Sequence, residues 1–145
     1  MLKRMDNIGI VVDNLAATIA FFTELGLELE GQTTVEGPWV DRCIGLQGAR
    51  CDIAMLRTPD GHSRLELSKF QTPKALPSQP TNAPVNTLGI RRIMFAVQDI
   101  AAVLARLRPH GAELVDQVVQ YEDSYRLCYI RGPEGILIGL AEELS

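Results

Sequence analysis

An internal repeat is the feature that most constrains the fold of this chain. Residues 7–32 align without a gap with residues 92–117, an offset of 85 positions. The ends of the two copies also match, because the turn-forming stretch 58–61 aligns with 132–135. Self-similarity over so long a register indicates that one structural module occurs twice. The matched pairs include Ile8 with Ile93, Val12 with Val97, Gly26 with Gly111, and Leu29 with Leu114.

Each copy has the pattern of one strand, one helix and three further strands. Residues 7–12 alternate between two faces, as expected of a strand. Asp13 or Asn14 can then cap a helix whose apolar positions recur at helical spacing and which Gly26 can end. In the second copy Asp99 is the matching cap. The further apolar runs cover 27–36, 49–58 and 63–70 in the first copy, and 112–120, 125–131 and 136–142 in the second.

The predicted fold class is α+β, with two tandem βαβββ modules in a single domain that covers residues 1–145. Module one covers 1–71 and module two covers 88–145. The segment between them, 72–87, is rich in Pro, Thr, Ser and Asn and is predicted to be a linker. A short helical turn is predicted within 37–46. A chain of 145 residues is long enough to bury a core of its own.

Composition and charge exclude several functional classes. The formal net charge is −4, and the basic residues do not form the broad basic face that nucleic-acid binding requires. The longest apolar stretches, such as 93–97, are too short to cross a membrane, and a secretory signal is not expected. The three cysteines, Cys43, Cys51 and Cys128, follow no metal-binding spacing. They are predicted to be buried, reduced thiols of a cytoplasmic protein.

Three stretches carry a resemblance to a known family. They are 5–13, 92–99 and 132–138, which read MDNIGIVVD, RIMFAVQD and GPEGILI. Together with the duplication, they make the chain similar to the vicinal oxygen chelate superfamily, which contains glyoxalases, bleomycin resistance proteins and extradiol dioxygenases. The resemblance covers nearly the whole chain. It implies that the two modules form a U-shaped cup in which four side chains usually hold a divalent cation, and that this cation polarises oxygen atoms of the substrate.

The residues at the four metal positions of that family do not suit a cation in this chain. Arg92 stands where the second module usually has histidine, and a guanidinium has no lone pair to donate and repels a cation. The two histidines, His62 and His110, do not restore the site, since His62 and Glu66 lie about 13 Å apart along one strand. No cofactor is therefore expected, and a divalent metal is expected only if an atypical site forms. The four positions are Asn7, Glu66, Arg92 and Gly139.

We hypothesise that Arg92 takes over the positive charge of the missing cation. The resemblance implies that Arg92 and Glu66 converge in the cup, where the guanidinium can offer a two-pronged contact to a carboxylate, an enolate or a phosphate. The alternative is that the two side chains form an internal ion pair at the relic of a metal site. Gly139 is expected to leave open space opposite them. The predicted ligand-binding residues are Arg92, Glu66, Asn7, Arg64, Met94 and Tyr125, with Tyr121 and Tyr129 as further candidates for aromatic walls.

Two classes of function follow from these residues. The first is a binding protein that holds a small, partly apolar metabolite or drug, either anionic or uncharged, without a metal. The second is a lyase or isomerase of the glyoxalase or epimerase kind, in which Glu66 is the base and Arg92 steadies an enolate. A dioxygenase-like enzyme is a weaker alternative, because ring cleavage needs two histidines and a carboxylate around iron. The expected partners are a small-molecule ligand and a second copy of the chain in a homodimer, with no nucleic acid and no membrane.

Overall fold

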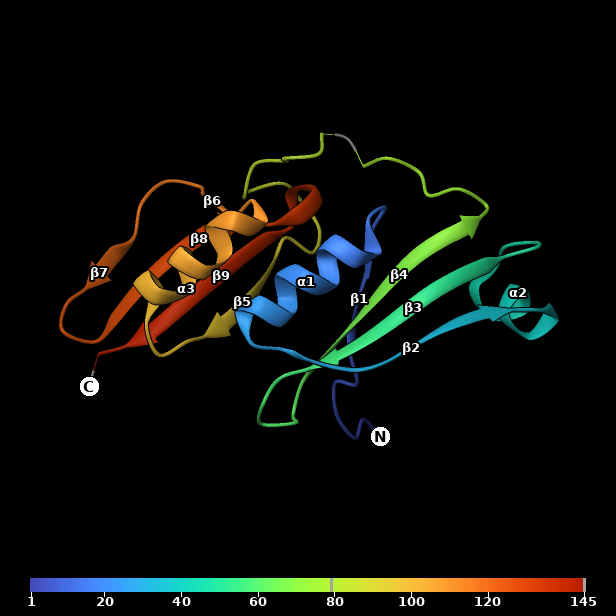
Figure 1. Cartoon of the computed structure of the whole chain (residues 1–145), viewed down its shortest axis with the longest axis horizontal. Helices are drawn as coiled ribbons and strands as arrows, with labels where there is room; N and C mark the ends of the chain where they lie inside the picture. Colours follow the sequence, from blue (N-terminus) through green and yellow to red (C-terminus); the bar gives the residue numbers. More distant parts are fainter. Residues whose placement is uncertain (79, 145) are drawn as a thin grey trace. The chain divides into compact units, whose positions relative to one another are not determined.

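The chain divides into two compact units, Met1–Leu76 (unit 1) and Pro77–Ser145 (unit 2). The computed structural model describes residues 1–78 and 80–144, so that Gln79, within the predicted linker, and Ser145 lie outside the described residues. Each unit has its own sheet and its own long helix (Figure 1). The α+β class and the two βαβββ modules predicted from the repeat are therefore confirmed.

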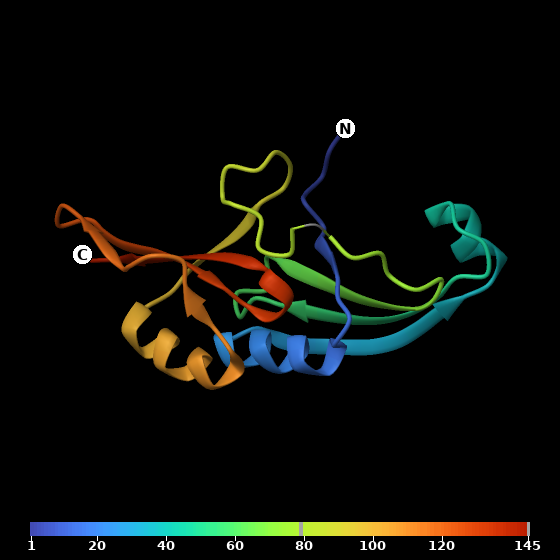
Figure 2. The same ribbon diagram turned by 90° about the horizontal axis from the view of Figure 1, so that it is seen from above.

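Unit 1 is built on a four-stranded sheet in the order β1-β4-β3-β2. Its first and last strands, β1 and β4, run parallel, and the other neighbours run antiparallel. Figure 2 shows α1 on one side of this sheet and the short α2 on the other. The elements are β1 (Ile8–Val11), α1 (Leu15–Leu25), β2 (Glu28–Glu36), α2 (Pro38–Ile44), β3 (Arg50–Arg57) and β4 (Arg64–Thr72).

The ends of α1 are defined by a capping side chain at its start and a glycine at its end. The side chain of Asn14 accepts a hydrogen bond from the backbone N–H of Ala17 at 3.0 Å and so satisfies a free donor of the first turn. Gly26 ends the helix with a φ of 129°, a conformation that glycine adopts without strain. Between these ends, Phe21 and Phe22 are completely buried, which fixes the apolar face of α1 against the sheet.

Unit 2 repeats this plan with a five-stranded sheet in the order β5-β9-β8-β6, and β7 pairs with β8 beyond the end of β6. Asp99 caps α3 through the N–H of Ala102, as Asn14 does in unit 1. The elements are β5 (Arg92–Ala96), α3 (Ile100–Leu107), η1 (Arg108–His110), β6 (Glu113–Leu114), β7 (Val119–Tyr121), β8 (Tyr125–Arg131), η2 (Pro133–Gly135) and β9 (Leu137–Glu143).

The strand predicted over 112–120 is wrong as a single element. The structure has two short strands there, β6 and β7, and residues 115–118 between them belong to neither. The reason is a lack of packing, because every residue from Val115 to Tyr121 is exposed to solvent. Only the hairpin turn at Glu122, where φ is 51°, brings the chain back to pair with β8.

Alternate residues of each strand point to opposite sides of the sheet, as the pleat requires. One side packs under the long helix and forms the core, where Leu56 and Leu67 in unit 1 and Ile138 and Leu140 in unit 2 are fully buried. We call the side opposite the long helix the open face of that unit. The residues at the predicted site lie on or beside these two open faces.

The three cysteines differ in their exposure to solvent. Cys51 and Cys128 are buried, but Cys43 is exposed, so the prediction of three buried thiols is wrong for Cys43. It lies on α2, where Val40 takes the buried position instead. None of the helices in the described part of the chain combines the length and the apolar character needed to cross a membrane.

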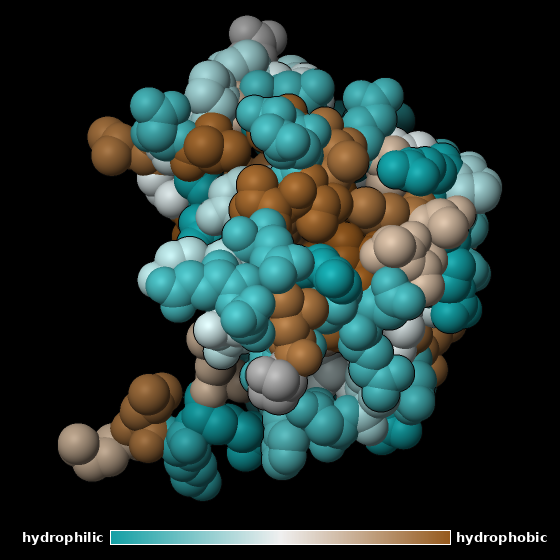
Figure 3. All heavy atoms as spheres, turned by 90° about the vertical axis from the view of Figure 1, so that its left-hand side faces the viewer, coloured by the Kyte–Doolittle hydropathy of each residue, from teal (hydrophilic) through white to brown (hydrophobic). Residues whose placement is uncertain are grey.

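Apolar side chains also reach the surface of unit 2. Val115, Val118 and Val119 are each exposed by more than a third of their area. Figure 3 faces the side of the molecule where β7 and the carboxyl end of the chain lie in Figure 1. It shows hydrophobic side chains gathered in the middle of the view and bordered by hydrophilic ones. An apolar patch of this kind on a folded protein often marks a contact surface.

Candidate functional site

In unit 1 the site is organised by the pairing of the first and last strands. Gly9 of β1 lies opposite Glu66 of β4, and Met55 of β3 lies on the other side of Glu66. Glu66 is half-buried on the open face. No atom outside the glycine's immediate chain neighbours lies within 4 Å of the point where a Cβ of Gly9 would be, so the space beside the carboxylate is open.

Glu66 has no hydrogen-bond or ion-pair partner among residues 1–78 and 80–144. Asn7 directly precedes β1 and is also half-buried, so both family positions of unit 1 lie on or beside the open face. A carboxylate that no cation neutralises can accept a proton or a hydrogen bond from a ligand. This residue has the chemistry expected of a base.

Arg64, predicted to bind ligand, is engaged by a neighbouring acid. Its Nε lies 2.7 Å from Oε1 of Glu30, and both side chains are about one-third exposed. A register shift between Leu29 and Gly31 places Glu30 at an irregularity of β2. The hydrogen bond and the negative charge of Glu30 raise the pKa of Arg64 further. The positive charge of Arg64 is therefore balanced within unit 1.

Cys51 is a second group on the open face of unit 1, next to Ser68 and in register with Phe70. Burial raises the pKa of the Cys51 thiol, and the nearby charges of Asp52 and Glu66 act in the same direction. The hydrogen bond with Ser68 opposes them. A buried thiol with a raised pKa is a poor nucleophile, so Cys51 is a packing residue.

In unit 2 the site is organised by Arg92, at the start of β5. Its guanidinium carbon lies 5.1 Å from the centroid of the Tyr129 ring, within the range of a cation–π contact. Arg92 is exposed, and no carboxylate pairs with it in the described part of the chain. The guanidinium is thus held over an aromatic ring while its N–H donors stay open to a ligand.

The expectation that Gly139 leaves open space is wrong. A Cβ at this position would meet Met94 Sδ at 2.7 Å and Met94 Cε at 2.8 Å, with Cε1 of Tyr129 at 3.4 Å. Met94 lies beside Gly139 in the register of β5 and β9, and its thioether folds over the glycine. The volume that the family's second carboxylate would need is therefore filled by a side chain of the same unit.

Of the tyrosines of β8, Tyr129 is the one whose ring contacts Arg92. Tyr125 lies opposite Glu143, whereas Tyr129 lies opposite Gly139. Four residues on one strand separate the two tyrosines by about 13 Å. Only the register of β8 against β9 distinguishes them, and the sequence alone does not show it.

The residues at the family's metal positions do not fit a divalent cation. Asn7 and Glu66 offer oxygen donors in unit 1, but unit 2 offers a guanidinium and a glycine covered by Met94. No three His, Cys, Asp or Glu side chains lie close enough to hold a metal ion within residues 1–78 and 80–144. A guanidinium at a ligand position donates no lone pair.

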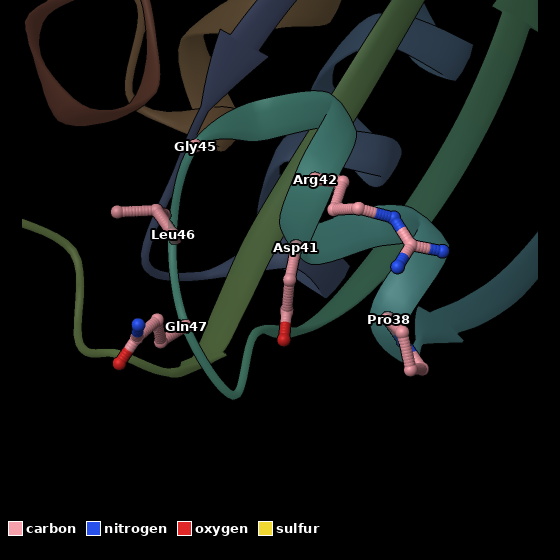
Figure 4. Close-up of a pocket in the computed structure, with 6 residues that line it drawn as sticks. All are labelled: Pro38, Asp41, Arg42, Gly45, Leu46 and Gln47. Atoms are coloured by element: carbon pink, nitrogen blue, oxygen red, sulfur yellow. The ribbon is translucent and has the colours of Figure 1, made fainter.

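A separate depression of about 580 Å³ lies beside α2 in unit 1. Figure 4 shows that the side chains around it diverge, with Leu46 and Gln47 turned away from Arg42. The carboxylate of Asp41 accepts hydrogen bonds from the N–H groups of Gly48 and Ala49, both at 2.9 Å, and is thus occupied in holding the loop. Without convergent polar groups the depression is not a ligand site. Its lining residues are Pro38, Asp41, Arg42, Gly45, Leu46 and Gln47.

Comparison with known proteins decides the family. Residues 4–140 match the model of the glyoxalase/bleomycin resistance protein/dioxygenase superfamily. The chain belongs to this superfamily. The predicted resemblance is confirmed.

Three proteins are similar to this chain over nearly its whole length. The crystal structure of a glyoxalase family protein from Bacillus cereus is 59% identical, with a TM-score of 0.95 over 100% of this chain and 97% of that one. YaeR of Escherichia coli (strain K12) is 27% identical over 98% of each chain. YwbC of Bacillus subtilis (strain 168) is 28% identical over 93% of this chain and 94% of its own.

Proposed function

We propose that this superfamily member binds the anionic group of a small molecule through Arg92, without a divalent cation. The observation that carries the proposal is the state of Arg92, a guanidinium that stacks on Tyr129 and has no acid partner in the described residues. Its charge is permanent, and its planar N–H groups match a carboxylate in two-pronged geometry. The ligand would be a metabolite or a drug.

Two further observations support the proposal. The thioether of Met94 covers Gly139, so no acid at that position competes with an anionic ligand for Arg92. Arg131, the other cation at this end of β8, donates to the carbonyl oxygens of Ala83 and Gly135 and is thus used within unit 2. Arg92 is the more exposed of these two cations, and its guanidinium is the one open to an anion.

A second candidate function is a lyase or isomerase reaction with Glu66 as base. It is favoured by the half-buried, unpaired carboxylate of Glu66 and by the open space over Gly9. In such a reaction Glu66 removes a proton from the carbon next to a carbonyl group of the substrate. A dioxygenase-like reaction is not supported, because the site residues include no histidine.

Anion binding is tested by calorimetric titration of the whole protein with acetate, pyruvate and inorganic phosphate. Binding is expected to fall at least about tenfold in Arg92→Gln, since a charged hydrogen-bonding group is lost. Arg108→Gln removes an exposed guanidinium of the same unit and is expected to change nothing. Equal binding in the wild type and Arg92→Gln contradicts the proposal. Metal analysis of the protein, together with Glu66→Ala, tests its metal-free part: stoichiometric metal that is lost in this variant contradicts it.

The enzymatic candidate is tested by the exchange of methyl protons of pyruvate with deuterium oxide, followed by NMR. Catalysed exchange that disappears in Glu66→Gln supports the base, and exchange at the uncatalysed rate in the wild type rejects pyruvate-type proton abstraction. The homodimer and the cytoplasmic location stay predictions. Light scattering after size-exclusion chromatography tests the first.

A further inference from the structure

Beyond Arg92, the open face of unit 2 continues as an apolar surface. Strand pairing places Met94, Gly139 and Tyr129 in one row across β5, β9 and β8. The next row along these strands consists of Ala96, Ala141 and Leu127, and Val119 of β7 lies opposite Leu127. None of these side chains is charged. We call this surface the apolar strip: Met94, Gly139, Tyr129, Ala96, Ala141, Leu127 and Val119.

The two rows of the apolar strip differ in height. In the first row Met94 folds over Gly139 towards Tyr129 and makes a raised edge. In the second row Ala96 and Ala141 present only methyl groups, so the floor is lower there. Adjacent rows on one face lie about 7 Å apart, since a strand rises by about 3.4 Å per residue. The strip is long enough for the body of a small organic molecule whose acidic end lies at Arg92.

The charges at the two ends of the strip are opposite. Arg92 lies at the first end, and Glu143, exposed and in register with Tyr125, lies at the second. No cation pairs with Glu143 in the part of the chain that the structure describes. A ligand with a second negative group would bring it towards Glu143, where like charges repel. The end at Glu143 therefore accepts an uncharged group.

A single guanidinium also limits the charge of the group that it receives. A phosphate monoester carries about −1.5 to −2 at neutral pH, which one arginine does not neutralise. Arg131 is less free to turn to a ligand than Arg92, because two of its N–H donors hold the carbonyl oxygens of Ala83 and Gly135. A carboxylate carries one charge and matches the planar guanidinium with two parallel hydrogen bonds.

We infer that the ligand is an amphipathic monocarboxylate, with its acid group on Arg92 and an uncharged apolar body on the apolar strip. This inference rests on the proposed function and adds the class of molecule. It distinguishes three features of the ligand: one carboxylate, an apolar body about one to two rows long, and no second charge at the far end. Contact of the body with Ala96, Leu127 and Val119 removes apolar surface from water and strengthens binding.

Calorimetric titration of the whole protein with three probes tests this inference. Octanoate is expected to bind at least about 30-fold more tightly than acetate, because each methylene contributes roughly twofold when half-buried. Octanedioate, which has the same length but a second carboxylate, is expected to bind at least about tenfold more weakly than octanoate. Acetate and octanoate of equal affinity, both lost in Arg92→Gln, overturn the inference while the proposed function stands.

Two variants locate the body of the probe. Ala96→Asp adds a negative charge to the exposed edge of the strip and is expected to weaken octanoate at least about tenfold while changing acetate less. Ala101→Asp makes the same change on the exposed side of α3 and is the matched control. Val119→Ala, a milder change, is expected to weaken octanoate about two- to threefold.

Two results overturn the inference together with the proposed function. In the first, octanoate binds equally well to the wild type and to Arg92→Gln. In the second, none of the three probes binds to the wild type. An equal loss of octanoate in Ala96→Asp and Ala101→Asp overturns the placement on the strip, since only the first substitution lies on it.

Discussion

The two units use one pair of strand positions in opposite ways. In unit 1 the glycine is on the first strand and the acidic side chain is on the last, as Gly9 and Glu66. In unit 2 the large residue is on the first strand and the glycine on the last, as Met94 and Gly139. The space over Gly9 is open, whereas Met94 fills the space over Gly139. After a duplication, the same backbone register has thus come to present an acid in one copy and a thioether in the other.

The helix-covered faces show a second reversal, this time of charge. In unit 1 Asp52 of β3 lies opposite Lys69 of β4, and at the matching place in unit 2 Arg126 of β8 lies opposite Glu142 of β9. Glu142 is buried and accepts a hydrogen bond from the N–H of Ile100 at 2.8 Å, at the start of α3. The two units therefore keep the same fold although the positions of the acid and the base are exchanged. The acid contributes more to stability in unit 2, where it is buried, than in unit 1.

The largest expected effect on the free energy of unfolding comes from removing the buried carboxylate of Glu142. Glu142→Ala leaves the buried N–H of Ile100 and the guanidinium of Arg126 without their acceptor, and is expected to lower the free energy of unfolding by about 2–3 kcal/mol. Lys69→Ala removes an exposed contact with Asp13 at 3.8 Å and is expected to cost about 0–1 kcal/mol. Denaturant unfolding followed by circular dichroism measures both. If Glu142→Ala and Lys69→Ala lower the free energy of unfolding equally, the proposed difference between the two units is wrong.

A smaller effect tests the exchanged glycines. Gly139→Val forces Met94 away from Tyr129 and is expected to cost about 1–2 kcal/mol, since overpacking is partly relieved by the flexible thioether. Gly9→Val meets open space and is expected to change the free energy of unfolding by less than about 0.5 kcal/mol. The pair of variants is compared by denaturant unfolding.

The double variant Gly139→Val/Met94→Ala supplies the control for this test. If Met94 is the obstacle, its truncation recovers part of the loss caused by Gly139→Val, in a coupling that a double-mutant cycle measures. Additive losses show instead that the backbone of β9, and not the thioether, resists the larger side chain.

A third difference between the units is expected in the alkylation rates of their buried thiols, Cys51 in unit 1 and Cys128 in unit 2. Burial raises the pKa of both Cys51 and Cys128. Asp41 holds the loop that leads into β3 through the N–H groups of Gly48 and Ala49. Asp41→Ala is expected to open this loop and to speed alkylation of Cys51 by about tenfold, while Cys128 keeps its rate. Mass spectrometry after timed iodoacetamide treatment measures each site.

Cys43 serves as the internal reference, because it is exposed in the native protein and reacts first. If Asp41→Ala raises the alkylation rates of both Cys51 and Cys128, the whole chain is destabilised. This result contradicts a local role for Asp41. Asp41→Asn keeps an acceptor oxygen and is expected to lie between the wild type and Asp41→Ala.

The smallest effect concerns pH. Hydrogen bonds from Thr34 and Gln71 hold the pKa of Asp52 below its ordinary value. A depressed pKa stabilises the fold above the unfolded pKa, and this contribution is lost as the pH falls through the folded pKa. Asp52→Asn is therefore expected to flatten the acid side of the stability profile below about pH 4. Unchanged curvature in urea titrations from pH 2 to about 7 contradicts this role.

Much of the fold follows from the repeat. Alternation and turn residues predict the strand 49–58, and β3 covers Arg50–Arg57; they predict 63–70, and β4 covers Arg64–Thr72. The ends of these strands are set by local turn residues, and the same turn residues recur at the matching places of the second copy. The strand over 112–120 is interrupted because residues 115–118 are exposed and do not pack against the core, although the N–H of Val115 still donates to the carbonyl oxygen of Tyr129 in β8.

The site is less predictable than the fold. The sequence places Arg92 and Met94 on one face, but it does not say that Met94 folds over Gly139 or that Arg92 stacks on Tyr129. Those contacts depend on the side-chain rotamers and on the register of β5 against β9, whose paired residues are 45 positions apart in the sequence. Whether Arg92 and Glu66 act on one ligand stays a prediction.

The segment between the repeats has a consequence for the ancestry of the chain. Arg131 donates to the carbonyl oxygen of Ala83, and Gly135 lacks the Cβ that would collide with Thr81 and Asn82. Residues that the repeat leaves out are thus built into the body of unit 2. The start of the second repeat in the sequence and the start of unit 2 in the structure are therefore different positions. A half-length ancestor would have to be reconstructed from Pro77 onward, since a cut at the start of the repeat would remove a segment that the second half holds by its own side chains.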